Sequence, residues 1–173
     1  AIIMAAVFNM IGATQISRVA ETVTSGLIDA KEATQLIVLT AVIGAILWNV
    51  VTWYFGIPSS SSYALVGGLV GAALVEGGSS IILWNGIIWK VAVPMVVSPI
   101  AGFCLAFCIM KGVLRLSRRQ EKVFRYLQIG SAGFVALSHG LNDAQKSMGI
   151  ITLGLFAAKV ISAPHIPFWV IAS

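Results

Sequence analysis

Long apolar runs, separated by short polar stretches, dominate the chain. Four apolar runs are long enough, or almost long enough, to form helices that cross a membrane: residues 1–17, 34–55, 91–110 and 126–158. A further run begins in residues 166–173. An α-helix rises about 1.5 Å per residue, so about 20 apolar residues cross a hydrocarbon core of about 30 Å. The pattern therefore predicts an all-α, polytopic integral membrane protein.

The segment 57–76 differs from these runs because its apolar part is too short to cross a membrane by itself. It follows a run of serines, and we expect it to form a half-helix or a re-entrant element. Gly67 and Gly71 have GxxxG spacing, and Ala64 and Gly68 extend the same small-residue face. Another backbone can approach such a face closely.

The composition agrees with a membrane environment. Hydrophobic residues make up 58% of the chain and charged residues 10%, with a mean hydropathy of +0.96, whereas soluble domains carry about 25% charged residues. A soluble domain of this length could not bury so much apolar surface. Cys104 and Cys108 lie inside an apolar run, which indicates packing rather than a disulfide framework or a zinc site.

The excess of basic residues gathers in one place. The formal net charge is +5, and residues 111–125 account for all of it, with six basic side chains and one acidic one. Loops rich in Lys and Arg stay in the cytoplasm, so we expect residues 111–125 to form a cytoplasmic basic loop. Contact with nucleic acid or anionic lipid is the alternative, but topology already explains the charges, and we expect no nucleic-acid partner.

Two ionisable side chains, Asp143 and Lys146, interrupt the last long apolar run. Placing either at membrane depth costs about 2.5–3.5 kcal/mol, so such residues usually face a cavity or a partner. A local ion pair between positions three apart on a helix is the structural alternative. That alternative leaves the polar residues around them unexplained, so we treat this segment as a candidate site.

The same segment contains groups suited to binding a cation. Gly140 offers a place where the helix can break and free main-chain groups for an ion. Asn142 and Asp143 add oxygen ligands, which suit Na⁺ or H⁺ better than a thiophilic metal. We expect no cofactor, and no metal other than Na⁺ acting as a coupling ion at Asp143. A hydrolase triad of Ser138, His139 and Asp143 is the alternative, but no nucleophile-elbow motif accompanies it.

The serine run has the complementary chemistry. Pro58 favours the first position of a helix, and the serines after it supply hydroxyl donors. The helix that follows adds free N–H groups and a dipole that attract an anion such as phosphate. The alternative is a polar turn with a serine helix cap.

At these two places the chain resembles the PiT family of inorganic phosphate transporters, especially its bacterial members. Residues 140–149, Gly-Leu-Asn-Asp-Ala-Gln-Lys-Ser-Met-Gly, are similar to the second Gly-x-Asn-Asp motif of that family, and residues 58–62, Pro-Ser-Ser-Ser-Ser, to its Pro-x-Ser-Thr/Ser-Ser/Thr element. Tyr63 stands where the family commonly has His. The resemblance covers essentially the whole chain, so we interpret residues 1–173 as one partial transporter domain, an internal fragment.

The resemblance implies inverted repeats that bring an Asn-Asp segment and a serine-rich half-helix to a site at the membrane midplane. The family's first Gly-x-Asn-Asp motif is absent from the chain, which would then hold about half of the binding machinery. Carried over by residue, the phosphate ligands are Ser60, Ser61, Ser62 and Asn142, and the cation ligands are Asn142 and Asp143. Supporting positions around them are Ser59, Gln145, Lys146 and Ser147.

We therefore expect a secondary active transporter, not an enzyme, that moves inorganic phosphate with Na⁺ or H⁺ by alternating-access symport. Its partners are phosphate, the cation and the lipid bilayer of the cell (plasma or inner) membrane, and assembly into a homo-oligomer is left open. One alternative is a channel for anions or small solutes, which does not require a buried Asp143. Another is an intramembrane hydrolase that uses Asp143 and His139 as acid and base.

Overall fold

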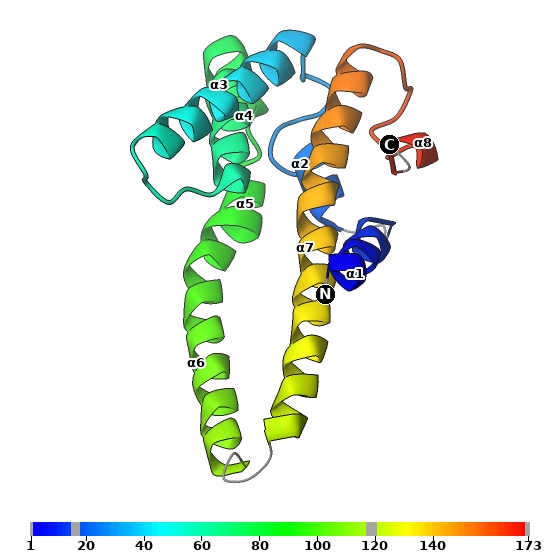
Figure 1. Cartoon of the computed structure of the whole chain (residues 1–173). Helices are drawn as coiled ribbons and strands as arrows, with labels where there is room; N and C mark the ends of the chain where they lie inside the picture. Colours follow the sequence, from blue (N-terminus) through cyan, green and yellow to red (C-terminus); the bar gives the residue numbers. More distant parts are fainter. Residues whose placement is uncertain (1, 15–17, 117–120, 172–173) are drawn as a thin grey trace.

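The computed structural model describes residues 2–14, 18–116 and 121–171. Helices account for most of them (Figure 1), and β-structure in the described residues is confined to one isolated bridge between Ile28 and Ile82. The expected all-α fold is confirmed. The α-helices are α1 (Ile2–Thr14), α2 (Arg18–Ser25), α3 (Gln35–Tyr54), α4 (Ser61–Gly77), α5 (Trp84–Ile87), α6 (Val93–Leu116), α7 (Glu121–Ala157) and α8 (Phe168–Ile171).

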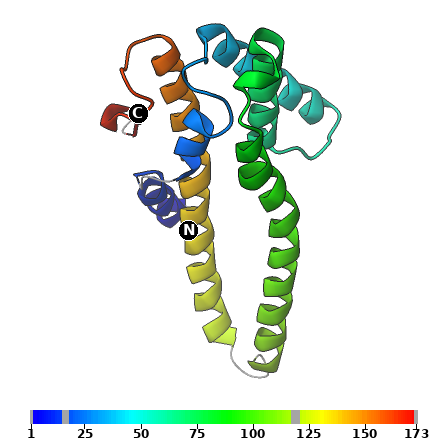
Figure 2. The same ribbon diagram turned by 180° about the vertical axis from the view of Figure 1, so that it is seen from behind.

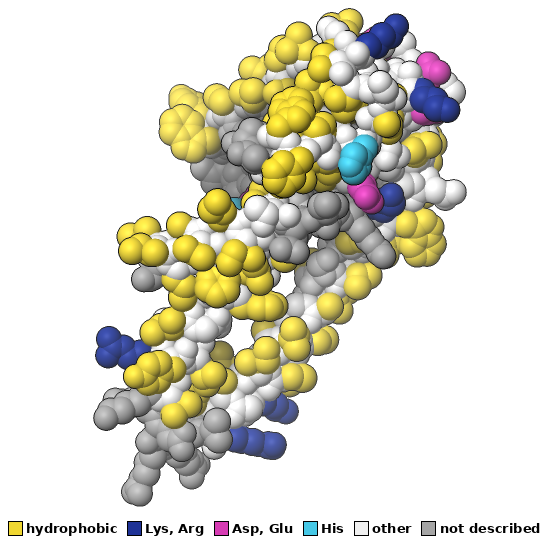
Figure 3. All heavy atoms as spheres, turned by 90° about the vertical axis from the view of Figure 1, so that its right-hand side faces the viewer, with side chains coloured by type: hydrophobic (Ala, Val, Ile, Leu, Met, Phe, Trp, Pro, Cys, Tyr) yellow, Lys and Arg dark blue, Asp and Glu magenta, His cyan; other side chains and the backbone are white. Residues whose placement is uncertain are grey.

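Two long helical arms extend from the more compact end of the molecule (Figures 1 and 2). One consists of α5, a π-helical segment η2 (Ile88–Ala92) and α6 in succession, and the other is α7, which has 37 residues. Among the described residues, Gln35–Tyr54 and Trp84–Arg115 are long and apolar enough to cross a membrane, and Ile2–Thr14 is apolar but shorter. Apolar side chains cover much of the surface (Figure 3), as expected where lipid or further protein surrounds the helices.

The segment expected as a basic loop, residues 111–125, is largely helical. Helix α6 continues to its end at Leu116 and α7 begins at Glu121, so only residues 117–120 lie outside the described helices. Lys and Arg are good helix formers, and the Lys111 ammonium lies 4.8 Å from the centre of the Phe107 ring. The expectation of a loop is therefore wrong for most of this segment. The described Lys and Arg side chains of this segment lie toward the far end of the arms (Figure 3).

Helices α3 and α4 form an antiparallel hairpin. At its base, the hydroxyl of Thr34, the N-cap of α3, donates to Glu76 Oε1 over 2.6 Å. Halfway along, Gly68 of α4 lies against the Ala41 carbonyl of α3. The chain thus returns to the end of the hairpin from which it started. That residues 57–76 form a half-helix or a re-entrant element stays a prediction.

The small-residue face of α4 is used at Gly68 and not at Gly67 or Gly71. A Cβ on Gly68 would lie 2.5 Å from the Ala41 carbonyl oxygen, whereas a Cβ on Gly67 or Gly71 would meet nothing within 4 Å. The GxxxG pair therefore makes no close contact with the described residues. Gly68 instead lets the backbones of α3 and α4 approach closely.

Replacing Gly68 with Ala should separate α3 from α4 and lower the melting temperature in detergent. The clash is with a backbone oxygen, which cannot move aside easily, and overpacking of this kind costs about 1–3 kcal/mol. Gly67→Ala is the matched control, because the added methyl has space and Ala is the better helix former. Equal destabilisation by both substitutions would contradict the close contact between Gly68 and Ala41.

Helix α7 is continuous from Glu121 to Ala157, so the helix break expected at Gly140 is wrong. The glycine has a different use, because a Cβ on Gly140 would collide with the Asn9 carbonyl of α1. Gly12 of α1 lies in the same way against the Leu137 carbonyl of α7. Paired glycines thus let the two helices cross with their backbones in contact.

The connection between the first two apolar runs contains helix α2. Its buried residues Ala20 and Val23 are three positions apart, which places them on one helix face. Both lie against Gly149 of α7. A short amphipathic helix lacks the continuous apolar run of a membrane span, so a search for such runs misses it.

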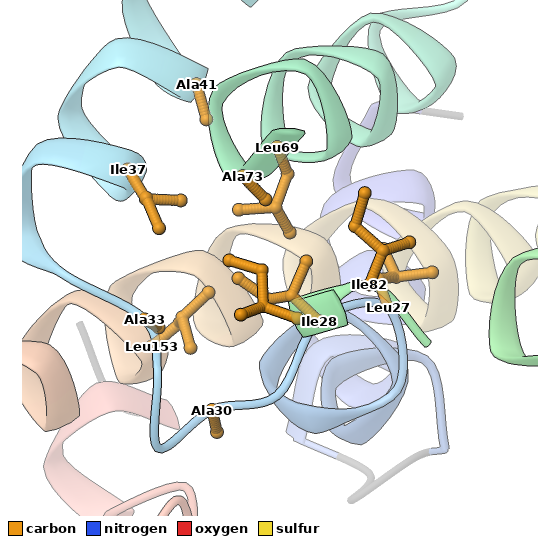
Figure 4. Close-up of a cluster of buried hydrophobic side chains, with 11 residues drawn as sticks. Leu27, Ile28, Ala30, Ala33, Ile37, Ala41, Leu69, Ala73, Ile82 and Leu153 are labelled. Atoms are coloured by element: carbon orange, nitrogen blue, oxygen red, sulfur yellow. The ribbon is translucent and has the colours of Figure 1, made fainter. Parts of the chain in front are cut away.

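The buried core lies where α3, α4, α7 and the segments after α2 and α4 meet (Figure 4). Backbone hydrogen bonds join those two segments, from Leu83 N–H to the Leu27 carbonyl and from Asp29 N–H to the Ile81 carbonyl. The core therefore fixes the base of the hairpin against α7. Its buried members are Leu27, Ile28, Ala30, Ala33, Ile37, Ala41, Leu69, Ala73, Ile81, Ile82 and Leu153.

A second buried cluster holds the C-terminal helix α8, where a further span was expected to begin. Ile166 and Val170 pack here with Ala20 of α2 and Met148 of α7. Helix α8 is therefore anchored to α2 and α7.

Candidate functional site

The serine run lies at the tip of the hairpin, between α3 and α4. Helix α3 ends at Tyr54, and Gly56 takes a φ of 65°, a left-handed conformation that glycine adopts without strain. The chain can then turn so that Ile57 N–H donates to the Thr52 carbonyl over 2.8 Å. An extended stretch follows and leads to Ser60, the N-cap of α4.

The serines make different contacts. Ser59 Oγ lies 2.8 Å from Thr52 Oγ1, which ties the tip to α3. Ser60 occupies the N-cap position of α4, as the alternative of a serine helix cap expects, but its hydroxyl makes no capping hydrogen bond. Ser62 Oγ accepts a hydrogen bond from Lys146 Nζ of α7. Because the first N–H groups of a helix have no partner within it, the tip offers both hydroxyl and amide donors.

Two ionisable side chains of α7 contact the carboxylate of Asp143 on the same helix. Lys146 Nζ lies 2.7 Å from Asp143 Oδ1, and His139 Nδ1 lies 3.0 Å from Asp143 Oδ2. The local ion pair considered from the sequence is therefore present. It is not confined to α7, however, because the same Lys146 ammonium also donates to Ser62. Lys146 thus joins the hairpin tip to the carboxylate of Asp143.

A pocket of about 420 Å³ opens between the hairpin tip, α2, α7 and the arm that contains η2. We call it the tip pocket. Its polar lining residues are Thr22, Ser60, Ser62, Tyr63, Lys90, Asn142 and Lys146. Its apolar lining residues are Val23, Leu27, Leu65, Val66, Leu69, Val91 and Pro94.

The tip pocket brings together part of the site predicted from the sequence. Ser60, Ser62, Asn142 and Lys146 come from segments far apart in the chain and line one space. Asp143 does not line it and is joined to it through Lys146. The other predicted positions lie outside the lining: Ser59, Ser61, Gln145 and Ser147.

Sequence reasoning missed Lys90 and Thr22. Lys90 stands beside Trp89 at the start of a span, which is typical of a residue at the membrane interface. Thr22 belongs to α2, the helix that the apolar pattern did not predict. One signal was available, because Pro94 follows Lys90 by four positions and disturbs the helix at that point.

The electrostatics of the tip pocket favour an anion. Two ammonium groups, those of Lys90 and Lys146, line it, and its described lining contains no carboxylate. Hydroxyl and ammonium donors can replace the hydration of a ligand that carries several charged oxygens. A metal centre has no such support, since no cluster of three or more His, Cys, Asp or Glu side chains occurs in the described part of the chain.

Comparison with known proteins identifies the class. The sequence matches the phosphate transporter family over residues 1–120 and 113–173. The chain belongs to this family, and the resemblance noted from the two motifs is confirmed. Transport, the function that the family description names, involves no covalent catalysis.

Similar bacterial proteins carry a consistent description. The chain is 44% identical to a probable low-affinity inorganic phosphate transporter of Mycobacterium tuberculosis, over 100% of this chain and 43% of that protein. Proteins of the same description from Rhizobium meliloti and Bacillus subtilis are 46% and 42% identical, over 99% and 98% of this chain and 53% of each relative. The chain spans about half the length of these relatives.

A solved structure shares the fold. It is that of a protein named the sodium-dependent phosphate transporter, and it superposes with a TM-score of 0.81 at 20% sequence identity, covering 98% of this chain and 62% of that one. The arrangement of long arms, short helices and hairpin is therefore shared with that protein.

Proposed function

We propose that the protein is a secondary active transporter that takes up inorganic phosphate together with a cation. The observation that carries this proposal is the position of Lys146. Its ammonium bonds to Ser62 at the hairpin tip and to Asp143 on α7. One side chain thus links donors suited to an anion with a carboxylate suited to a cation.

Phosphate is held in the tip pocket by the hydroxyls of Ser60 and Ser62, the first N–H groups of α4 and the Lys146 ammonium. These donors replace its hydration without adding a carboxylate that would repel it. Asn142 donates its side-chain N–H to the Ser138 carbonyl over 2.8 Å, which leaves its amide oxygen for a cation. Asp143 supplies the second oxygen ligand.

The coupling follows from competition at Asp143. Its carboxylate is paired with Lys146, and a cation that binds Asp143 displaces the ammonium and leaves its full charge to phosphate. Each ligand then strengthens the binding of the other, as reciprocity between two linked sites requires. Hard oxygen ligands suit Na⁺, and the similarity in fold to a transporter named as sodium-dependent supports Na⁺ over H⁺.

The same proposal includes placement in the cell. We place the protein in the plasma (inner) membrane as a multi-pass protein, with residues 111–125 on the cytoplasmic side because of their positive charge. The remainder of the site, including a first Gly-x-Asn-Asp motif, belongs to the part of the transporter outside this chain.

Uptake by the full-length protein tests the proposal. In vesicles with an inward Na⁺ gradient, labelled phosphate should accumulate above its external concentration, and collapse of the gradient should release it. Vesicles with an H⁺ gradient of the same size identify the coupling ion, and protein-free vesicles are the control. Equilibration without accumulation would indicate a channel and would overturn the symport proposal.

A further inference from the structure

Lys90 is the described cation of the tip pocket for which the predicted phosphate site has no role. It comes from η2, on the arm separate from α7, and it lines the pocket together with Lys146 and the serines. The two lysines therefore reach one space from two different helical arms. A cation at membrane depth usually faces a cavity or a partner.

The local sequence explains why the helix changes form at Lys90. In an α-helix the Lys90 carbonyl would accept the N–H of the fourth residue after it, but that residue is Pro94, which has no N–H and whose ring crowds this carbonyl. The backbone forms a π-helical segment instead, with Val93 N–H bonded to the Ile88 carbonyl. Single π-helical turns of this kind are frequent at functional sites.

The surroundings of the Lys90 ammonium are polar but contain no described countercharge. A Cβ on Gly26 would lie 2.8 Å from Lys90 Nζ, so the absence of a side chain there makes room for the ammonium. This position is just past the C-terminal end of α2, where helix carbonyls favour a cation. The ion pairs among the described side chains join Asp143 to His139 and to Lys146, and none involves Lys90.

The two lysines therefore differ in charge balance. Asp143 offsets much of the charge of Lys146, whereas the charge of Lys90 stays uncompensated by the described residues. The apolar walls of the tip pocket strengthen any electrostatic interaction inside it, because the effective dielectric constant is lower than in water. Lys90 therefore offers an anion in this pocket a positive charge that no described carboxylate offsets.

We propose that Lys90 is a phosphate-binding residue that supplies a second positive charge, opposite Lys146, to the anion held by Ser60 and Ser62. The inference rests on the proposed phosphate site and extends it to a further helical arm. Two ammonium groups match the one to two negative charges of phosphate near neutral pH. The π-helical segment η2 positions the Lys90 ammonium.

Binding of labelled inorganic phosphate to the full-length protein in detergent tests this role. Lys90→Gln should weaken binding by roughly ten- to a hundredfold, the usual range for loss of a hydrogen bond to a charged group. Lys90→Arg should keep most of the affinity, because guanidinium also binds phosphate. Lys31→Gln is the matched control, since Lys31 is exposed like Lys90 but does not line the pocket.

A second measurement uses the parent protein and so does not depend on the folding of a variant. Saturating phosphate should slow the modification of Lys90 by an amine-reactive reagent, as measured by mass spectrometry, and should leave Lys31 unaffected. Unchanged binding by Lys90→Gln, or equal modification of Lys90 with and without phosphate, would overturn the role of Lys90. Failure of the parent protein to bind phosphate at all would instead overturn the proposed function.

Discussion

Gradient-driven phosphate uptake should collapse when Asp143 is replaced by Asn. The substitution preserves shape and removes the charge that holds the coupling cation, and the lost contact is worth about 1.5–3 kcal/mol, roughly ten- to a hundredfold in cation affinity. Phosphate binding without a gradient should persist, because the Lys146 ammonium loses its countercharge and becomes fully available to the anion. The expected phenotype is therefore binding without cation dependence.

The control for this experiment is another carboxylate of the chain. Glu76 accepts a hydrogen bond from Thr34 at the base of the hairpin and lies outside the tip pocket. Glu76→Gln keeps an acceptor there and should leave cation-dependent uptake close to that of the parent. Uptake by Asp143→Asn at the level of this control would reduce Asp143 to a structural partner of Lys146.

Phosphate affinity should fall when either pocket serine is replaced by Ala, and should stay near the parent value for Ser61→Ala. The hydroxyls of Ser60 and Ser62 line the tip pocket and that of Ser61 does not. Each lost hydrogen bond to the charged ligand corresponds to roughly a ten- to hundredfold change in affinity. The measurement is binding of labelled phosphate by the three serine variants, made together with their melting temperatures in detergent.

The melting temperature separates a binding role from a structural one. The Ser60 hydroxyl caps nothing, so Ser60→Ala should melt close to the parent protein. Ser59→Ala removes the contact with Thr52 and should lower the melting temperature with less effect on affinity. A set of variants that all bind phosphate like the parent and only melt earlier would show that the anion site is placed wrongly.

The sequence predicts the parts of this fold that depend on local pattern. The apolar run of α3 and the serines before α4 are visible in the order of residues alone, since helix length and helix-terminus chemistry are local properties. The chemistry of Asn142 and Asp143 is equally local. These features led to the family and to four of the seven polar residues that line the tip pocket.

Features that depend on contacts between distant segments escaped prediction. Gly140 suggested a helix break because its partner, the Asn9 backbone, lies far away in the chain. Lys90 resembled an interfacial lysine because its place in one pocket with Ser62 and Lys146 exists only once the arm and the hairpin are assembled. The pattern of apolar residues within one segment does not show which distant segment will pack against it.

The hairpin of α3 and α4 has a mechanical consequence for transport. Its two helices are fastened at three levels, by Thr34 with Glu76 at the base, by Gly68 on Ala41 midway and by Thr52 with Ser59 near the tip. Because these contacts join the two helices along their length, we expect the hairpin to move as a unit, with its tip outside the buried core. The hydrogen bond from Lys146 to Ser62 joins the tip of the hairpin to α7. If this bond breaks and the hairpin tilts during transport, Ser60 and Ser62 move with the hairpin while Asn142 and Asp143 stay on α7. The proposed ligands of phosphate and of the cation would then separate in one movement.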